Sequence, residues 1–283
     1  MVIMKSLLQH LLLSLFVIVL GVSSLYCFSS ITLIALGVPS PSPSPSSSTT
    51  ADTTTNATLN EVPVLNSKGV SLNGLGKFNE SITYFDKVLA LDPKNVLALT
   101  EKGNALGGLG NYTQAITYYD KALAVDPKNA TVLDNKGVAF YHIGNYTEAI
   151  AYYDKALALD PTIVFALYDK GNALVALEKY SEAITYFDKA LALDPKHVLA
   201  LIGKGYALDK LGNHTQAVFY YDKANATDPR YIPALTEKGD LLDKIANYKL
   251  AIIYYDKALA IDPKNIDAIK GKQQALAALN QTE

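Results

Sequence analysis

From Val62 to the C-terminus, hydrophobic residues recur every three or four positions, the spacing of one face of an α-helix. The pattern is interrupted at Gly110-Asn111, where a turn is favoured, and again at Asp126-Pro127. Proline lacks an amide donor and disfavours the helical conformation of the residue before it, so a helix should end there. The stretch between two Asp-Pro pairs therefore predicts a hairpin of two amphipathic helices.

The hairpin repeats with a period of 34 residues. The Asp-Pro pairs begin at Asp92, Asp126, Asp160, Asp194, Asp228 and Asp262. A Lys-Gly pair recurs in the same register, with its glycine at Gly69, Gly103, Gly137, Gly171, Gly205 and Gly239. Because glycine inside a helix costs about 1 kcal/mol relative to alanine, a close neighbour must compensate for it. We expect that neighbour to be the ring at Phe85, Tyr119, Tyr153, Phe187, Tyr221 or Tyr255 in the second helix.

The segment from Gly103 to Pro127, with Gly-x-Tyr-x-x-Ala-Ile-x-Tyr-Tyr-x-Lys-Ala-Leu-x-x-Asp-Pro at its end, resembles the tetratricopeptide repeat, whose period is 34. The resemblance covers about four-fifths of the chain, from Val62 onward. It implies an all-α fold, a right-handed superhelical solenoid of six repeats and a C-terminal capping helix, with a concave groove lined mainly by the first helices. The repeats would span residues 62–95, 96–129, 130–163, 164–197, 198–231 and 232–265, followed by a capping helix and tail at 266–283.

Two departures from the family pattern carry expectations of their own. The first-helix position before the glycine, usually leucine in the family, is lysine throughout: Lys68, Lys102, Lys136, Lys170, Lys204, Lys238 and Lys272. We expect its stem to lie on apolar surface while its ammonium reaches solvent or the series Asp86, Asp120 and Asp154. The fifth repeat has Asn225 and Thr227 where its siblings have aliphatic residues, so its hairpin should be the weakest.

The N-terminal part of the chain has a different composition. Residues 7–38 form an uncharged, largely apolar run, long enough to span a bilayer as a signal-anchor or transmembrane segment at 1–38. Lys5 precedes it, so the positive-inside rule keeps the N-terminus cytoplasmic and the repeats extracytoplasmic. Possible signal-peptidase sites at residues 21–24 and 35–37 leave cleavage and secretion as an alternative to anchoring. Residues 39–61, rich in Pro, Ser and Thr, predict a disordered stalk.

Glycosylation sequons, Asn-x-Ser/Thr, are more frequent than chance would give. The candidate sites are Asn56, Asn79, Asn111, Asn129, Asn145, Asn213 and Asn280. An eighth sequon, at Asn225, falls in a position that faces inward in the other repeats. Duplication of one turn motif explains three of the sites, so the excess is only partly independent evidence for an extracytoplasmic glycoprotein.

The composition argues against several kinds of chemistry. The formal charge is −2 and Arg230 is the only arginine, which disfavours a nucleic-acid partner. Cys27 is the only cysteine and the four histidines are scattered, so we expect no metal site and no cofactor. No nucleophile stands beside a plausible base, and we expect the protein not to be an enzyme.

A binding surface should vary between repeats that otherwise share their core. The varying candidates on the expected groove are Asn104, Thr131, Tyr141, His142, Phe165, Tyr168, Asn172, Tyr206 and Asp209. The lysine and arginine positions of the family's carboxylate clamp hold Thr100, Tyr168, Phe165 and Asp169, so the clamp is absent. We expect a neutral, aromatic-lined groove that becomes acidic toward the C-terminal repeats and suits apolar or basic peptides.

These observations favour a membrane-tethered, extracytoplasmic scaffold that binds extended or helical peptide segments of envelope proteins. The alternative is a structural, glycosylated cell-surface repeat protein without a specific ligand.

Overall fold

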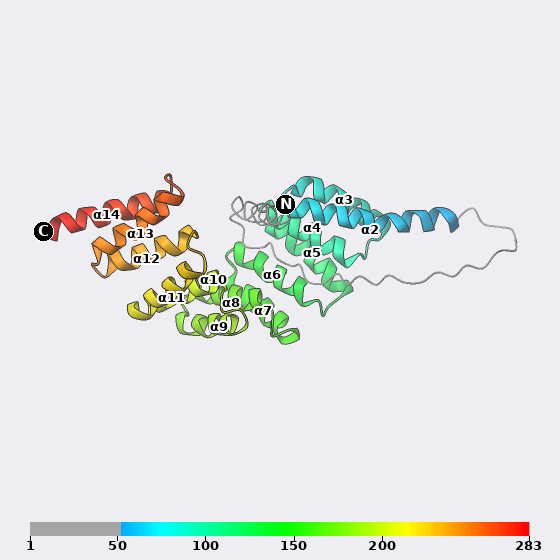
Figure 1. Cartoon of the computed structure of the whole chain (residues 1–283). Coiled ribbons are helices and arrows are strands. Elements are labelled where there is room, and N and C mark those ends of the chain that lie inside the picture. The colour runs from blue at the N-terminus through cyan, green and yellow to red at the C-terminus, as the bar shows by residue number, and fades with distance from the viewer. Residues whose placement is uncertain (1–51, 283) are drawn as a thin grey trace, which may run out of the picture. The chain divides into compact units, whose positions relative to one another are not determined.

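The computed structural model describes the backbone of residues 52–282 and the side chains of residues 61–281, and these residues form helices without strands (Figure 1). The first three helices are α2 (Asp52–Gly74), α3 (Phe78–Leu91) and α4 (Val96–Gly108). They are followed by α5 (Tyr112–Val125), α6 (Ala130–His142), α7 (Tyr146–Leu159), α8 (Val164–Ala176) and α9 (Tyr180–Leu193). The last five are α10 (Val198–Lys210), α11 (His214–Thr227), α12 (Ile232–Lys244), α13 (Tyr248–Ile261) and α14 (Ile266–Thr282).

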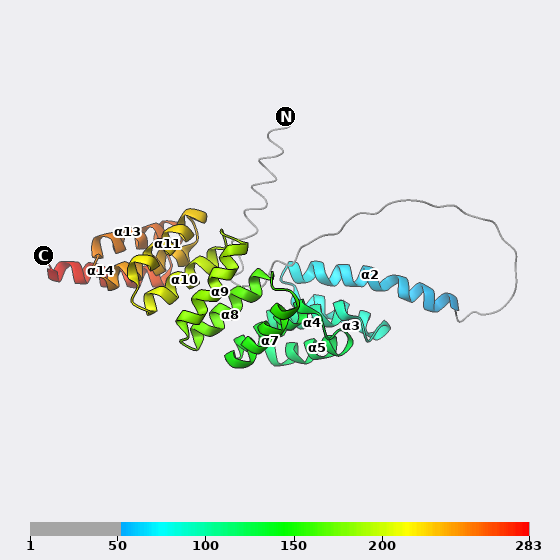
Figure 2. The same ribbon diagram turned by 90° about the horizontal axis from the view of Figure 1, so that it is seen from below.

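The chain divides into two compact units, up to Gly110 and from Asn111 onward. The first unit holds α2, α3 and α4, which pack in sequence. The second holds α5 to α14, in which α6–α7, α8–α9, α10–α11 and α12–α13 are antiparallel hairpins and α14 closes the C-terminal end (Figure 2). The predicted all-α solenoid of helical hairpins with a C-terminal capping helix is confirmed.

The helix ends follow from the residues that punctuate the repeat. Gly144 and Gly212 adopt a φ of +79° in the turn between the two helices of a hairpin, a conformation that glycine reaches without steric cost, and Gly110 has the same φ. Asn145 and Asn213 then cap the second helix by accepting a hydrogen bond from the backbone amide three residues later. Each second helix ends one residue before the Asp of an Asp-Pro pair, as predicted.

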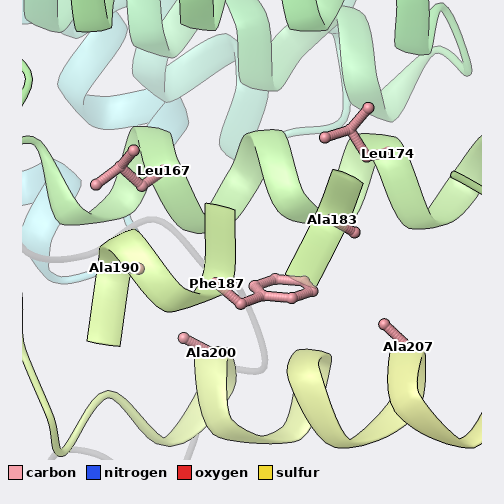
Figure 3. Packing of buried hydrophobic residues seen from close by; sticks show 7 residues of the cluster. All are labelled: Leu167, Leu174, Ala183, Phe187, Ala190, Ala200 and Ala207. Carbon is pink, nitrogen blue, oxygen red and sulfur yellow. The ribbon is translucent and has the colours of Figure 1, made fainter. Parts of the chain in front are cut away.

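In five hairpins an aromatic ring of the second helix lies against a glycine of the first helix. A Cβ atom added to Gly171 would lie 2.5 Å from the ring of Phe187, and one added to Gly137 would lie 2.6 Å from the ring of Tyr153. The same close approach of a ring is found at three further glycines, with Phe85 against Gly69, Tyr221 against Gly205 and Tyr255 against Gly239. Figure 3 shows the ring of Phe187 between α8 and α10, surrounded by leucine and alanine side chains. The predicted compensation for these helical glycines is therefore confirmed for these five pairs.

In the second unit the two kinds of helix form separate layers. The first helices of consecutive hairpins contact one another, as α6 with α8, α8 with α10 and α10 with α12. The second helices α7, α9, α11 and α13 lie farther from one another than the first helices do. The first helices of this unit therefore form the more closely spaced layer.

The N-terminal boundary differs from the expectation. Helix α2 begins at Asp52 and continues through Pro63, so residues 52–61 are helical rather than part of a disordered stalk. The prolines of the Pro/Ser/Thr tract are confined to residues 39–45, and beyond them no proline prevents a helix until Pro63. The predicted membrane segment at 7–38 and the rest of the predicted stalk lie outside the described residues. Within the described part, none of the helices combines the length and apolarity that a membrane span requires.

Candidate functional site

We define the first-helix surface as the face of α6, α8, α10 and α12 that is not covered by the second helices. Asp134, Tyr141, Tyr168, Asn172 and Tyr206 of this surface are buried or partly buried. Thr131, His142 and Phe165 are exposed. The sequence candidates therefore divide into small local groups, which differ in what they contact.

Tyr168 and Asn172 form one group on α8. They lie one helical turn apart, and both side chains are partly buried. The ring of Tyr168 lies 5.2 Å from that of His197, and the ring of Phe165, which is 41% exposed, lies 5.5 Å from His197. The Nδ1 atom of His197 accepts a hydrogen bond from the amide of Ala200, and burial lowers its pKa, so the imidazole is neutral at pH 7. This group is an aromatic patch with one amide.

Tyr141 and His142 lie at the C-terminal end of α6. The ring of His142 stacks on Tyr112 at 4.6 Å, whereas Tyr141 meets Tyr146 edge-on at 5.2 Å. His142 thus packs against the start of α5, and Tyr141 against the start of α7. Thr131, at the other end of α6, is not brought close to either.

The candidates on α10 already have charged partners. The Nζ atom of Lys210 lies 4.9 Å from the centre of the Tyr206 ring. A carboxylate oxygen of Asp209 lies 2.8 Å from the Nζ atom of Lys244 and 2.9 Å from the Nδ1 atom of His214. Asn104 belongs to the first unit, where its amide donates to Glu101 at 3.3 Å.

Two carboxyl groups on this surface have raised pKa values. Asp134 on α6 is 9% exposed, and burial raises its pKa to about 7. Asp169 on α8 has a pKa well above its ordinary value because it is buried and because the charge of Asp134 is close. The sequence places Asp169 at a clamp position but does not show its burial, because it stands directly before Lys170 in a helix position where polarity alone does not reveal burial.

A second acidic group lies on α12. The hydroxyl of Tyr255 donates to Asp240 at 2.6 Å, and that of Tyr221 donates to Glu237 at 3.4 Å. Burial raises the pKa of Glu237, Asp240 and Asp243. Acidic side chains are therefore present at the C-terminal end, and Asp134 and Asp169 add two carboxyl groups with raised pKa values in the middle repeats.

The lysine series makes a repeated bridge within the solenoid. The ammonium of Lys136 pairs with Asp120 of the preceding second helix and lies 2.7 Å from the hydroxyl of Tyr152 in its own hairpin. The same arrangement joins Lys170, Lys204 and Lys238 to Asp154, Asp188 and Asp222 and to Tyr186, Tyr220 and Tyr254. Lys102 pairs with Asp86 in the first unit, and Lys272 lies 2.6 Å from Asp256. The predicted lysine–aspartate contacts are confirmed.

The described sequons lie mostly on accessible positions. Asn79, Asn111, Asn145, Asn213 and Asn280 are exposed. Asn129 is partly buried, and its amide donates to Asp126 at 3.0 Å. Both polar atoms of the Asn225 side chain are buried without a hydrogen-bond partner, which agrees with the expected inward orientation. The side chain of Asn56 is outside the described set.

The described residues contain no group of three or more His, Cys, Asp and Glu side chains placed to hold a metal ion. Their arrangement is that of a helical-hairpin solenoid with a partly aromatic, partly acidic first-helix surface.

The sequence matches family models of this class. Tetratricopeptide repeat models match residues 62–95, 100–162, 168–232 and 232–265. The chain therefore belongs to the tetratricopeptide repeat family, whose members are typically non-catalytic scaffolds for protein–protein interaction. A comparison with curated proteins finds no significant match.

Solved structures of the same fold include proteins of different roles. Cut9, from the APC/C hetero-tetramer Cut9-Hcn1, is 21% identical with a TM-score of 0.69 over 80% of this chain, which spans 45% of Cut9. PilF of Pseudomonas aeruginosa is 22% identical with a TM-score of 0.66, covering 78% of this chain and 99% of PilF. YrrB, described as having an unusual peptide-binding site, is 25% identical with a TM-score of 0.52, covering 67% of this chain and 97% of YrrB.

Proposed function

We propose that the protein is an interaction scaffold whose first-helix surface in the second unit binds an extended peptide segment of a partner protein. The observation that carries this proposal is the surface itself: the first-helix layer with the partly exposed aromatic patch of Phe165, Tyr168 and Asn172 beside the carboxylates of α6 and α8. Aromatic rings supply apolar contact area, and the asparagine amide suits hydrogen bonds to a peptide backbone. The likeness to YrrB supports the same proposal.

The test is affinity capture with the full chain and with a variant carrying Tyr168→Lys and Asn172→Lys. Two lysines at the centre of this surface should repel a basic partner and remove the aromatic contact. We expect captured partners to be lost while circular dichroism stays helical. The matched control is Ala158→Lys with Ala192→Lys, which adds the same charge at exposed positions of α7 and α9. Equal capture by both variants would overturn the proposal.

The proposed setting of the scaffold is outside the cytoplasm, held by the segment at residues 7–38. The support is that segment's length and lack of charge together with the exposed sequons Asn79, Asn111, Asn145 and Asn213. Protease treatment of intact cells, followed by mass spectrometry of the released asparagine-containing peptides, tests topology, cleavage and glycosylation together. Protection of the repeats from protease in intact cells would contradict this setting.

A second candidate is a structural surface protein without a specific ligand, which the same sequons favour. It predicts concentration-dependent self-association in sedimentation experiments and capture that is unchanged by the Tyr168 and Asn172 substitutions. The capture experiment therefore separates the two functions.

A further inference from the structure

We propose that Asp134 and Asp169 form a pocket that receives one lysine or arginine side chain of a peptide lying along the first-helix surface. The inference rests on the proposed function and adds the chemistry recognised at one position. It predicts that partner segments carry a basic residue where they cross α6 and α8.

The first step in the argument is the state of Asp134. Its side chain is 9% exposed, and its Oδ1 atom is buried with no hydrogen-bond partner in the described part of the chain. A buried carboxylate is costly unless it is protonated or receives a counter-ion and hydrogen bonds. Such a group is rarely left unpartnered without a reason, and a bound cation would supply the missing partner.

The second step is that the lysines on the same two helices are engaged elsewhere. Lys136, two residues after Asp134, pairs with Asp120, and Lys170, next to Asp169, pairs with Asp154. Both ammonium groups also contact a tyrosine hydroxyl of the second-helix layer. Among the described residues, neither Asp134 nor Asp169 forms an ion pair with a lysine of α6 or α8. Their negative charge is therefore neutralised either by a proton or by a cation from outside the chain.

The third step is the surroundings of the two carboxylates. Tyr168 directly precedes Asp169 on α8, and Tyr141 packs against a buried cluster that includes Ala173, one helical turn after Asp169. Burial raises the pKa of both tyrosine hydroxyls, and the charge of Asp169 raises it further. Tyrosine rings accommodate the methylene stem of lysine or the flat face of arginine and attract the cation itself. Two carboxylates between aromatic rings suit an organic cation better than a hard metal ion, which prefers six or more oxygen ligands.

The acidic group on α12 does not offer the same pocket. Glu237 and Asp240 already accept hydrogen bonds from Tyr221 and Tyr255, which partly satisfy them. Asp209 on α10 is paired with Lys244 and His214. On this surface, binding of a cation should therefore be most favourable at Asp134 and Asp169.

The test uses three peptides of the form Ac-Gly-Ser-X-Ser-Gly-NH2, with X as lysine, arginine or norleucine. They are titrated at low salt into the full chain carrying ¹³C-labelled aspartate carboxyl groups, observed by NMR. We expect the lysine and arginine peptides to shift the signals of Asp134 and Asp169 and the norleucine peptide to leave them in place. Signal shifts confined to exposed aspartates, or equal shifts of the Asp134 and Asp169 signals with the norleucine peptide, would overturn the proposal.

The variant Asp134→Asn with Asp169→Asn removes both charges while keeping the side-chain shape. It should bind the lysine and arginine peptides at least tenfold more weakly, and it should stay folded because it removes buried charge. Glu148→Gln, at an exposed position of α7, removes charge without touching the surface and should bind as the parent does.

The outcomes distinguish this inference from the proposed function. If the asparagine double variant keeps peptide affinity and keeps its captured partners, while the Tyr168 and Asn172 variant loses them, the pocket is wrong and the scaffold proposal stands. If both variants keep their partners, the scaffold proposal fails as well.

Discussion

At the scale of single residues, the chain combines a closely packed core with a few buried polar side chains that destabilise the fold. The core positions are mostly alanine and leucine, with glycine and one aromatic ring where helices approach closely. Against this background Asp134 is a destabilising residue, because the Oδ1 atom of its carboxylate is buried without a hydrogen-bond partner among the described residues. Residues of this kind are where stability and binding are expected to conflict.

Asp134 makes stability depend on pH in a defined direction. Its folded-state pKa of about 7 exceeds the ordinary value of 3.8, so between these values the folded chain holds a proton that the unfolded chain has released. Stability should therefore fall as pH rises from about 4 to about 7 and then level off. Asp134→Asn should raise the melting temperature at pH 8, corresponding to up to about 4 kcal/mol, and have little effect near pH 4. Thermal unfolding followed by circular dichroism across this range checks it, with Glu148→Gln as control.

If Asp134→Asn lowered the melting temperature equally at pH 4 and pH 8, this account would be contradicted. Such a result would mean that the Asp134 side chain makes a favourable contact both when it is charged and when it is protonated.

The helical glycines give a second prediction at this scale. In Gly171→Ala the new methyl would lie 2.5 Å from the Phe187 ring, so the helix-propensity gain of about 1 kcal/mol should be outweighed and the melting temperature should fall. Gly107→Ala, inside α4, meets no atom within 4 Å and should raise the melting temperature by the propensity gain. Equal effects of the two substitutions would show that the ring moves aside freely.

At the scale of the helices, the lysine bridges join successive hairpins through side chains that the family usually replaces with leucine. Each lysine comes from a first helix, and its aspartate and tyrosine come from the second helices on either side in sequence. The lysine stem lies in the core, with 7% side-chain exposure for Lys170, whereas its partner Asp154 is 54% exposed. Removing the aspartate of such a bridge and replacing its lysine by leucine should therefore change the free energy of unfolding by different amounts.

The prediction concerns Asp154→Ala and Lys170→Leu. Removing Asp154 leaves a buried ammonium with only the Tyr186 hydroxyl, which should cost about 1–3 kcal/mol. Lys170→Leu removes the buried charge and keeps the packing volume, so it should be neutral or slightly stabilising. Thermal unfolding of both variants and of the double variant measures the coupling between them. A Lys170→Leu cost larger than that of Asp154→Ala would show that the ion pair is a net source of stability.

At the scale of the whole molecule, each described hairpin is stabilised mainly by its neighbours in sequence, as in other repeat proteins. Stability then follows the local hairpin rather than one shared core, and a weak repeat opens locally. The fifth repeat is the expected weak point, because α11 has Asn225 with both polar atoms buried and unpartnered where the other second helices have leucine.

Hydrogen exchange of the full chain tests this point. Backbone amides in α11 should exchange faster than those in α9, the second helix of the preceding interior hairpin. Asn225→Leu should slow exchange in α11 and raise the melting temperature, because an unsatisfied amide pair costing about 1–3 kcal/mol is replaced by apolar contact. Uniform protection of α9 and α11, unchanged by the substitution, would place the weak point elsewhere.

The sequence by itself determined the hairpins and their ends. A period of 34 residues, glycine in each turn and Asp-Pro after each second helix leave few alternatives, because these residues act on the backbone locally. The glycine–ring pairs and the lysine–aspartate bridges were also predictable, since each depends on two positions repeated in register.

The tertiary structure alone decided which polar side chains are buried. Asp134 and Asp169 look like ordinary polar positions of amphipathic helices in the sequence, and their raised pKa values appear only when α6 and α8 pack together. Likewise, the composition of residues 39–61 predicted a stalk as one block, whereas its last ten residues continue the helix of the first hairpin. Burial and charge coupling depend on neighbours distant in sequence, which a local pattern does not specify.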